Sequence, residues 1–209
     1  MDITFIFFLG LIIALVGVIP PGLLNMTAAK ISLKEGHSRG IVFSIGVCVI
    51  VTAQTYIAAI FARYLSNHPE VIDVLQRVAF VIFVLITVYY LFIAKTQPKK
   101  QASPKIRSKH SRFFHGVFLS AINVFPIPYQ AYMTITLASV GWLDFDKISI
   151  ISYVAGATTG TFVMLYMYIF FFDKIKEKSV TSQKSMNLII GGITGVISIV
   201  TLINIIKEL

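Results

Sequence analysis

Prolines and neutral amide side chains occur together at two places in the chain, and this combination could bind a small polar molecule. The residues at these two places are Pro21, Gly22 and Asn25, and Asn123, Pro126, Pro128 and Gln130. Proline lacks a backbone N–H and clashes with the preceding helical turn, so it breaks a helix and leaves backbone groups without partners. Asparagine and glutamine amides donate and accept hydrogen bonds without carrying a charge. We therefore predict that these residues bind a substrate.

A helix that restarts after such a break presents free N–H groups and the positive end of its dipole, which favour a carboxylate. If the two breaks meet inside the protein, dipole ends and amides would bind a zwitterion without any fixed charge. Tyr129 and Tyr132 add hydroxyls and ring faces at the second break. Gln54, from another apolar segment, either lines the same site or joins two helices through a hydrogen bond. The alternative for each break is a kink that only shapes the helix bundle.

Other kinds of chemistry find little support in the chain. None of the nine acidic residues lies deep in an apolar segment, and the histidines lie in loops or near segment ends. This argues against metal transport, which needs oxygen-rich or thiolate ligands, and against membrane proteolysis. No phosphate-binding glycine loop is present, so we predict no cofactor and transport driven by a proton or sodium gradient. Glu35 and Asp144 could carry protons, although both are interpreted as solvated loop charges.

Long apolar segments place the chain in a membrane. Of its 209 residues, 56% are hydrophobic and 13% are charged, and a bilayer core is spanned by about 20 apolar residues. The first apolar run lacks a preceding basic region and a cleavage site, so we expect it to remain in the mature chain. We predict an all-α membrane protein with six transmembrane helices, at residues 3–29 (broken), 41–62, 78–94, 113–140 (broken), 148–172 and 188–206.

The basic residues predict the orientation of these spans. Fourteen of the 18 lysines and arginines follow the first, third and fifth spans. Because basic loops stay in the cytoplasm, we expect both termini outside, in the cytoplasmic (inner) membrane of a bacterium. The net charge of +9 is therefore explained by topology and by attraction to anionic lipid in the bilayer, and we predict no nucleic-acid partner.

The spans form two triplets, each of which opens with a broken segment. An odd number of spans per unit inverts the second unit relative to the first, as in many secondary transporters. We predict one transporter domain, 1–209, with two inverted three-helix repeats at 1–94 and 113–209 joined by a cytoplasmic linker at 95–112. Glycines four residues apart, which let helices pack closely, are Gly36 and Gly40, Gly156 and Gly160, and Gly191 and Gly195.

The same residues resemble the LysE/RhtB amino-acid exporters. Pro21-Gly22 matches their Pro-Gly-Pro motif except that Leu23 replaces the second proline, and the Gly36/Gly40 pair followed by Gly46 matches their glycine pattern. Asn123 is similar to the start of their Asn-Pro-Lys motif, but here the proline comes three residues later and the lysine is missing. The resemblance in length and hydropathy covers the whole chain. It implies export of amino acids or related metabolites from the cytoplasm, driven by an ion gradient.

We therefore predict a secondary-active exporter of amino acids or related small zwitterions. A membrane-embedded enzyme would need a convergent acid–base or metal set, which the spans lack. A non-transporting accessory subunit would not need two matched, amide-rich breaks. An exporter of a cation or another small metabolite is a further alternative. The substrate, the coupling ion and assembly into a homo-oligomer stay open.

Overall fold

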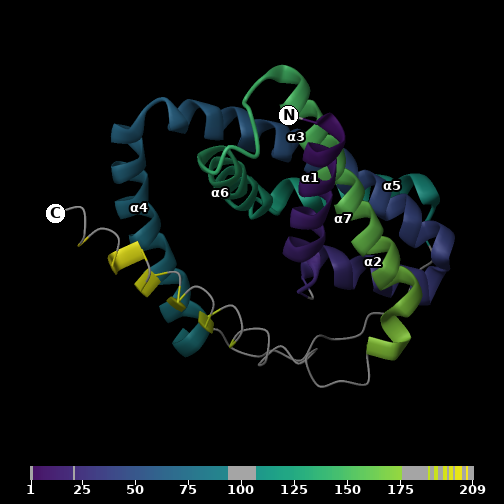
Figure 1. Ribbon diagram of the computed structural model, residues 1–209. Helices are drawn as coiled ribbons and strands as arrows, with labels where there is room; N and C mark the ends of the chain where they lie inside the picture. The colour runs from purple at the N-terminus through teal and green to yellow at the C-terminus, as the bar shows by residue number, and fades with distance from the viewer. Residues whose placement is uncertain are drawn as a thin grey trace. The chain divides into compact units, whose positions relative to one another are not determined.

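The computed structural model describes residues 2–20, 22–93 and 107–175, together with 188, 191–192, 195–196, 198–199, 201–203 and 206. Every element in these ranges is a helix (Figure 1). The chain divides into two compact units, Met1–Ser66 with Ser103–Ile175 and Asn67–Ala102 with Lys176–Leu209. The helices of the first unit are α1 (Ile3–Val18), α2 (Leu23–Glu35), α3 (His37–Ser66), α5 (Lys109–Ile122), α6 (Pro126–Ser139) and α7 (Lys147–Ile175). The second unit contains α4 (Pro69–Val88), which continues as a π-helix, Tyr89–Ile93.

Two described helices, α3 and α7, are long and apolar enough to cross a membrane, and the bent pair α1–α2 makes a third if it is counted as one span. The helical part of 78–94 is shorter than a typical span. The described residues thus contain two or three helices of membrane length and several shorter ones. Most of the predicted linker, 95–112, lies outside the described residues, and the predicted sixth span, 188–206, is described only in short separate pieces.

The first predicted span is broken in the structure as well. α1 ends at Val18, α2 begins at Leu23, and the two helices are bent by 78°. α2 then continues well past the predicted end of the span and stops only at Gly36, which has a φ of 95° that favours glycine. Nothing lies within 4 Å of a Cβ at Gly36, so this glycine caps a helix and is not a helix-packing contact. The predicted loop between the first two spans is therefore almost entirely helical.

The second break lies at residues 123–125, just before the prolines and not across them. α5 ends at Ile122, and Pro126 is the first residue of α6. The first helical position tolerates proline because its N–H would have no partner there in any case. Pro128 falls in the same first turn, where it interrupts no bond between turns. The two prolines therefore start a helix.

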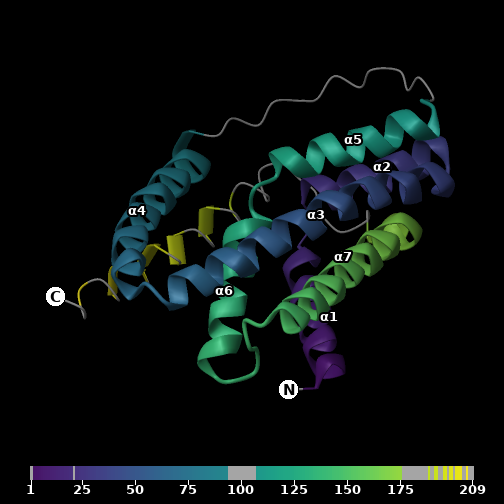
Figure 2. The same ribbon diagram turned by 90° about the horizontal axis from the view of Figure 1, so that it is seen from above.

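Backbones approach closely in the first unit, where α1 packs on α7 and α5 packs on α3 (Figure 2). A methyl group on Gly156 or Gly160 would overlap a backbone carbonyl of α1, and one on Gly10 would overlap a carbonyl of α7. Gly46 on α3 and Gly116 on α5 face each other's helix in the same way. These contacts need glycine because no side chain fits between the two backbones.

The other predicted packing glycines lie against side chains. A Cβ on Gly40 would lie 3.1 Å from Ser32 and 3.2 Å from Ile169. In the second unit, Gly191 faces Leu91 and Gly195 faces the methyl group of Thr87. The apolar core of the first unit sits between α2, α3 and α7, where Phe43, Val47, Leu165 and Ile169 are buried.

α7 begins after a loop in which Asp144 is exposed. Asp146 caps this helix, accepting hydrogen bonds from the backbone N–H groups of Ile148 and Ser149. Hydrogen bonds from the side chain and backbone of Ser149 lower the pKa of Asp146 from its usual value.

Candidate functional site

Side chains pair the carbonyl groups that are freed where α1 ends. Asn25 Nδ2 donates to the carbonyl oxygens of Val18 at 2.6 Å and Pro20 at 3.0 Å. The hydroxyl of Tyr168, from α7, donates to the carbonyl of Ile19 at 2.7 Å. Asn25 is 4% exposed. Its amide nitrogen therefore holds the first break together instead of facing a ligand.

The N-terminus of α2, on the other side of this break, has N–H groups without an acceptor among the described residues. Gly22 is its N-cap, with an extended backbone and no side chain to accept from the first turn. The N–H of Met26 bonds to the Gly22 carbonyl, but no described residue accepts from the N–H groups of Leu23 or Leu24. Pro21 lies outside the described residues. The first break thus offers hydrogen-bond donors at the positive end of a helix dipole.

The second break is closed by a residue from a different helix. Gln54, on α3, donates through Nε2 to the carbonyl oxygens of Ser120 at 3.2 Å and Asn123 at 3.0 Å. Gln54 is 6% exposed, and it lies 66 and 69 positions away from these two residues. Of the two interpretations of Gln54, joining two helices is therefore seen directly. The backbone of Asn123, and not its amide side chain, takes part in this contact.

The N-terminus of α6 presents no comparable donors. Pro126 and Pro128 have no N–H, and the N–H groups of Ile127 and Tyr129 bond to the carbonyls of Val124 and Phe125. The expectation that both half-helices restart with free N–H groups is therefore wrong for the second break. The prolines that begin the helix also remove its donors.

Gln130, one turn into α6, is engaged by α7. Its Oε1 accepts a hydrogen bond of 2.6 Å from the hydroxyl of Tyr153, and both residues are buried. Among the described residues, no hydrogen bond joins Gln130 or Asn25 to Gln54. The predicted amides are thus distributed over three contacts, each of which fastens one helix to a neighbour.

Tyr129 connects the two breaks. It lies in the first turn of α6, and its hydroxyl donates to the carbonyl of Ile13 on α1 at 2.9 Å. Its ring occupies the place where Gly17 would carry a side chain, with the nearest ring atom 2.6 Å from an ideal Cβ. Gly17 immediately precedes Val18, whose carbonyl is bound by Asn25. The start of the helix after the second break therefore packs against the end of the helix before the first.

Three buried oxygens have no hydrogen-bond partner within the described part of the chain. They are Gln54 Oε1, Thr55 Oγ1 and Ser120 Oγ. Buried polar groups are nearly always hydrogen-bonded in native proteins, so unpaired ones call for an explanation. The sequence singles out Gln54 but not Ser120, because nothing in the pattern of α5 marks Ser120 as different from any other small residue.

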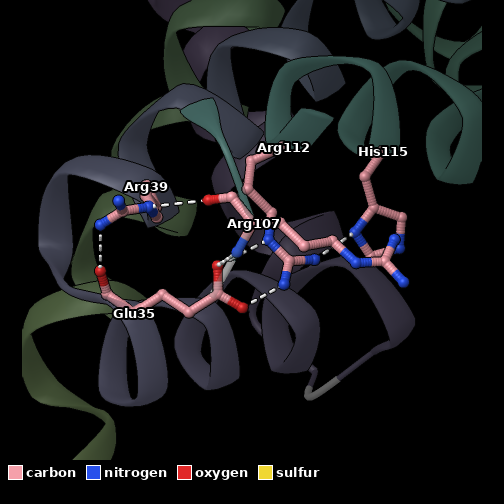
Figure 3. A network of polar contacts seen from close by, with 5 residues as sticks. All are labelled: Glu35, Arg39, Arg107, Arg112 and His115. Atoms are coloured by element: carbon pink, nitrogen blue, oxygen red, sulfur yellow. Dashed lines mark hydrogen bonds and ion pairs between the residues drawn. The ribbon is translucent and has the colours of Figure 1, made fainter. Parts of the chain in front are cut away.

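A second polar cluster joins the end of α2 to the start of α5 (Figure 3). Glu35 forms a two-pronged ion pair with Arg112, whose Nε lies 2.8 Å from the Glu35 Oε2 atom. Arg39 donates to the backbone carbonyls of Glu35 and Arg107, both at 2.9 Å. Arg112 also lies 3.2 Å from Nδ1 of His115; because arginine only donates, Nδ1 accepts.

Glu35 is therefore not the solvated loop charge that the sequence suggested. Its side chain is 4% exposed and that of Arg112 is 10% exposed. The reason is that α2 extends to Glu35 itself, which brings the carboxylate under the first turns of α5 (Figure 3). The partner lies 77 positions away, so the ion pair depends on how the two halves pack.

A family model described as LysE type translocator matches residues 15–204. The chain belongs to the LysE type translocator family. Members of this family are transporters, so this translocator is an integral, multi-pass membrane transporter and not an enzyme. The matched range contains both breaks and the three unpaired oxygens. No curated protein and no solved structure matches the chain.

Proposed function

We propose that this translocator exports an amino acid or a related small zwitterion from the cytoplasm, and that it binds this substrate between the two breaks. The observation that carries the proposal is the contact of Tyr129 with Ile13 and Gly17, which brings the two breaks together. Transporter sites are commonly built where broken helices meet. We assign to this site the residues that the sequence predicted, with the amides positioning the helix ends around it: Gly22, Asn25, Gln54, Asn123, Pro126, Pro128 and Gln130, together with Pro21, which lies outside the described residues.

The first break is the place for the substrate carboxylate. The N–H groups at the start of α2 have no acceptor among the described residues, and the positive end of the helix dipole favours an anion. Gly22 leaves these groups uncovered because it has no side chain. Asn25 stabilises this break by donating hydrogen bonds to the carbonyls on its other side.

Two inverted repeats account for the helix packing. The first half of span one, α1, packs on α7, and its counterpart in the second repeat, α5, packs on α3. In both pairs facing glycines let the backbones touch, with Gly10 opposite α7 and Gly116 opposite α3. This arrangement is what an approximate two-fold axis in the membrane plane would produce.

Efflux from proteoliposomes tests the function. Purified protein is reconstituted, loaded with radiolabelled amino acids, and given an imposed pH or sodium gradient. We expect gradient-driven release of at least one amino acid. Tyr132→Phe should leave this release unchanged, because Tyr132 is 65% exposed and, unlike Tyr129, does not contact the first break. Failure of every amino acid under both gradients would contradict the proposal.

Labelling tests the proposed orientation, with both termini outside. Single cysteines are placed at Ser66 and Ser103 in a Cys48→Ser background. An impermeant maleimide added to intact bacterial cells should label position 66 and not position 103. The reverse pattern would invert the topology without affecting the substrate proposal.

A further inference from the structure

The three unpaired oxygens stand apart from the other buried hydroxyls of the first unit. Ser44 on α3 and Thr134 on α6, both fully buried, donate to the carbonyl four residues earlier in their own helices. Ser120 and Thr55 are equally buried, but their hydroxyls make no such bond. An unpaired buried polar group loses its hydration without compensation. Such a group marks a place that an ordered water, an ion or a ligand can occupy, and Ser120 lies in the last turn of α5, beside the second break.

The orientation of Gln54 aims its oxygen into this region. Nε2 is held by two carbonyls at the end of α5, those of Ser120 and Asn123, so the amide group cannot turn without losing both bonds. The opposite end of the amide, Oε1, is consequently fixed near the C-terminus of α5. Ser120 supplies its own unpaired hydroxyl at the same end of that helix.

The electrostatics of this place favour positive charge. The last carbonyls of a helix carry the negative end of its dipole. The facing half-helix, α6, cannot compensate, because Pro126 and Pro128 have no N–H and the N–H groups between and after them are already bonded. The second break thus contains more hydrogen-bond acceptors than donors. No aspartate or glutamate occurs in the sequences of α3, α5 or α6, so a bound cation would not be held by a full opposite charge.

We propose that the second break binds a small monovalent cationic group through Gln54 Oε1 and Ser120 Oγ. Two sources share this chemistry, namely the ammonium group of the exported zwitterion and a free sodium ion. The ammonium source rests on the proposed function, and it would place the substrate with its carboxylate at the first break and its ammonium at the second.

Thermal unfolding of the purified full-length chain in detergent tests the site with three salts. Methylammonium chloride represents the ammonium group, sodium chloride the free ion, and tetramethylammonium chloride a cation of equal charge that has no N–H and is too bulky. A ligand that binds only the folded state raises the unfolding temperature by mass action. Protection by methylammonium identifies an ammonium site, and protection by sodium identifies an alkali-ion site. If neither differs from tetramethylammonium, the proposal is overturned.

Two variants locate the effect. Ser120→Ala removes an unpaired oxygen, so without added cation it should unfold at or above the wild-type temperature. Its half-maximal protection should need about tenfold more of the effective cation, the change expected when one hydrogen-bonding group is lost. The control Ser44→Ala removes an equally buried hydroxyl that is already bonded, and it should keep the wild-type response. Full protection of Ser120→Ala would refute the assignment.

The two proposals fail separately. Methylammonium and sodium carry no carboxylate, so their effect on unfolding does not require that the chain transports amino acids. Amino-acid efflux without any cation effect would remove the cation site alone. Protection without efflux of any amino acid would remove the proposed function and leave the site.

Discussion

At each break an amide side chain pairs the free carbonyls at the end of a helix, but the two amides come from different distances along the chain. At the first, Asn25 reaches back across five to seven positions to pair the carbonyls of Val18 and Pro20. At the second, Gln54 reaches across from α3 to pair the carbonyls of Ser120 and Asn123. The first break is therefore closed by local sequence, whereas the second exists in this form only when α3 and α5 are packed together.

The breaks also differ in polarity, which suits each of them to a different end of the proposed zwitterionic substrate. The N-terminus of α2 keeps donors, whereas the two prolines of α6 leave acceptors in the majority. A molecule with an anionic group at one end and a cationic group at the other fits such a pair without any buried fixed charge. The contact that ties the two breaks together, Tyr129 of α6 against Ile13 and Gly17 of α1, should then control their spacing.

The largest effect is expected at the ion pair that joins α2 to α5. Glu35→Leu leaves Arg112 buried without its partner, which should lower the free energy of unfolding by about 3 kcal/mol. The double variant Glu35→Leu/Arg112→Met should recover most of this loss, because two apolar side chains need no pairing. Unfolding by SDS titration in detergent micelles measures both. A single variant as stable as wild type would mean that the pair does not connect the two halves.

The second-largest effect is expected at Gln54, which pairs the carbonyls of the second break from a different helix. Gln54→Leu should lower the free energy of unfolding by about 2 kcal/mol, because it removes both hydrogen bonds to carbonyls at the end of α5. Faster hydrogen exchange should appear around 118–130 and not around 18–26. The control Tyr56→Phe, on the same helix, removes the hydroxyl of a side chain that is 43% exposed, and it should cost less than about 1 kcal/mol. Equal exchange at the two breaks would erase the distinction between them.

The local closure of the first break should be less sensitive. Asn25→Leu should cost about 1 kcal/mol, since Tyr168 still pairs the Ile19 carbonyl of the same break. Faster exchange should be confined to the first break. The SDS titration measures this loss of stability, and Thr27→Val on the same helix serves as the control. A loss larger than that of Gln54→Leu would reverse the comparison.

The smallest effect on stability is expected at the contact between the breaks. Tyr129→Phe keeps the ring against Gly17 and removes only the hydrogen bond to Ile13, which should cost about 0.5–1 kcal/mol. If the contact sets the spacing of the two breaks, the concentration of amino acid that gives half-maximal efflux should nevertheless rise. Tyr132→Phe, on the exposed side of α6, should leave both quantities unchanged.

Several features of the site could be predicted from sequence because their causes are local. Proline interrupts a helix wherever it stands beyond the first turn, so a break near Pro20 follows from the residue itself. The second break lies a few residues before the predicted position, since Pro126 at a first helical position begins a helix. Reading Glu35 as solvated failed for a related reason, because the apolar pattern ends several residues before α2 does.

The sequence alone determined the class of the protein and the position of its first break, and it located the second to within a few residues, because hydropathy and missing N–H groups act over a single turn of the chain. Only the tertiary structure decided what each amide does. Gln54 could donate to any carbonyl within reach, and the packing of Gly46 and Gly116 brings the end of α5 to it. Gln130 meets Tyr153, and Glu35 meets Arg112, for the same reason. A polar side chain carries its hydrogen-bonding capacity in its formula, but its partner is set by the helices that pack around it.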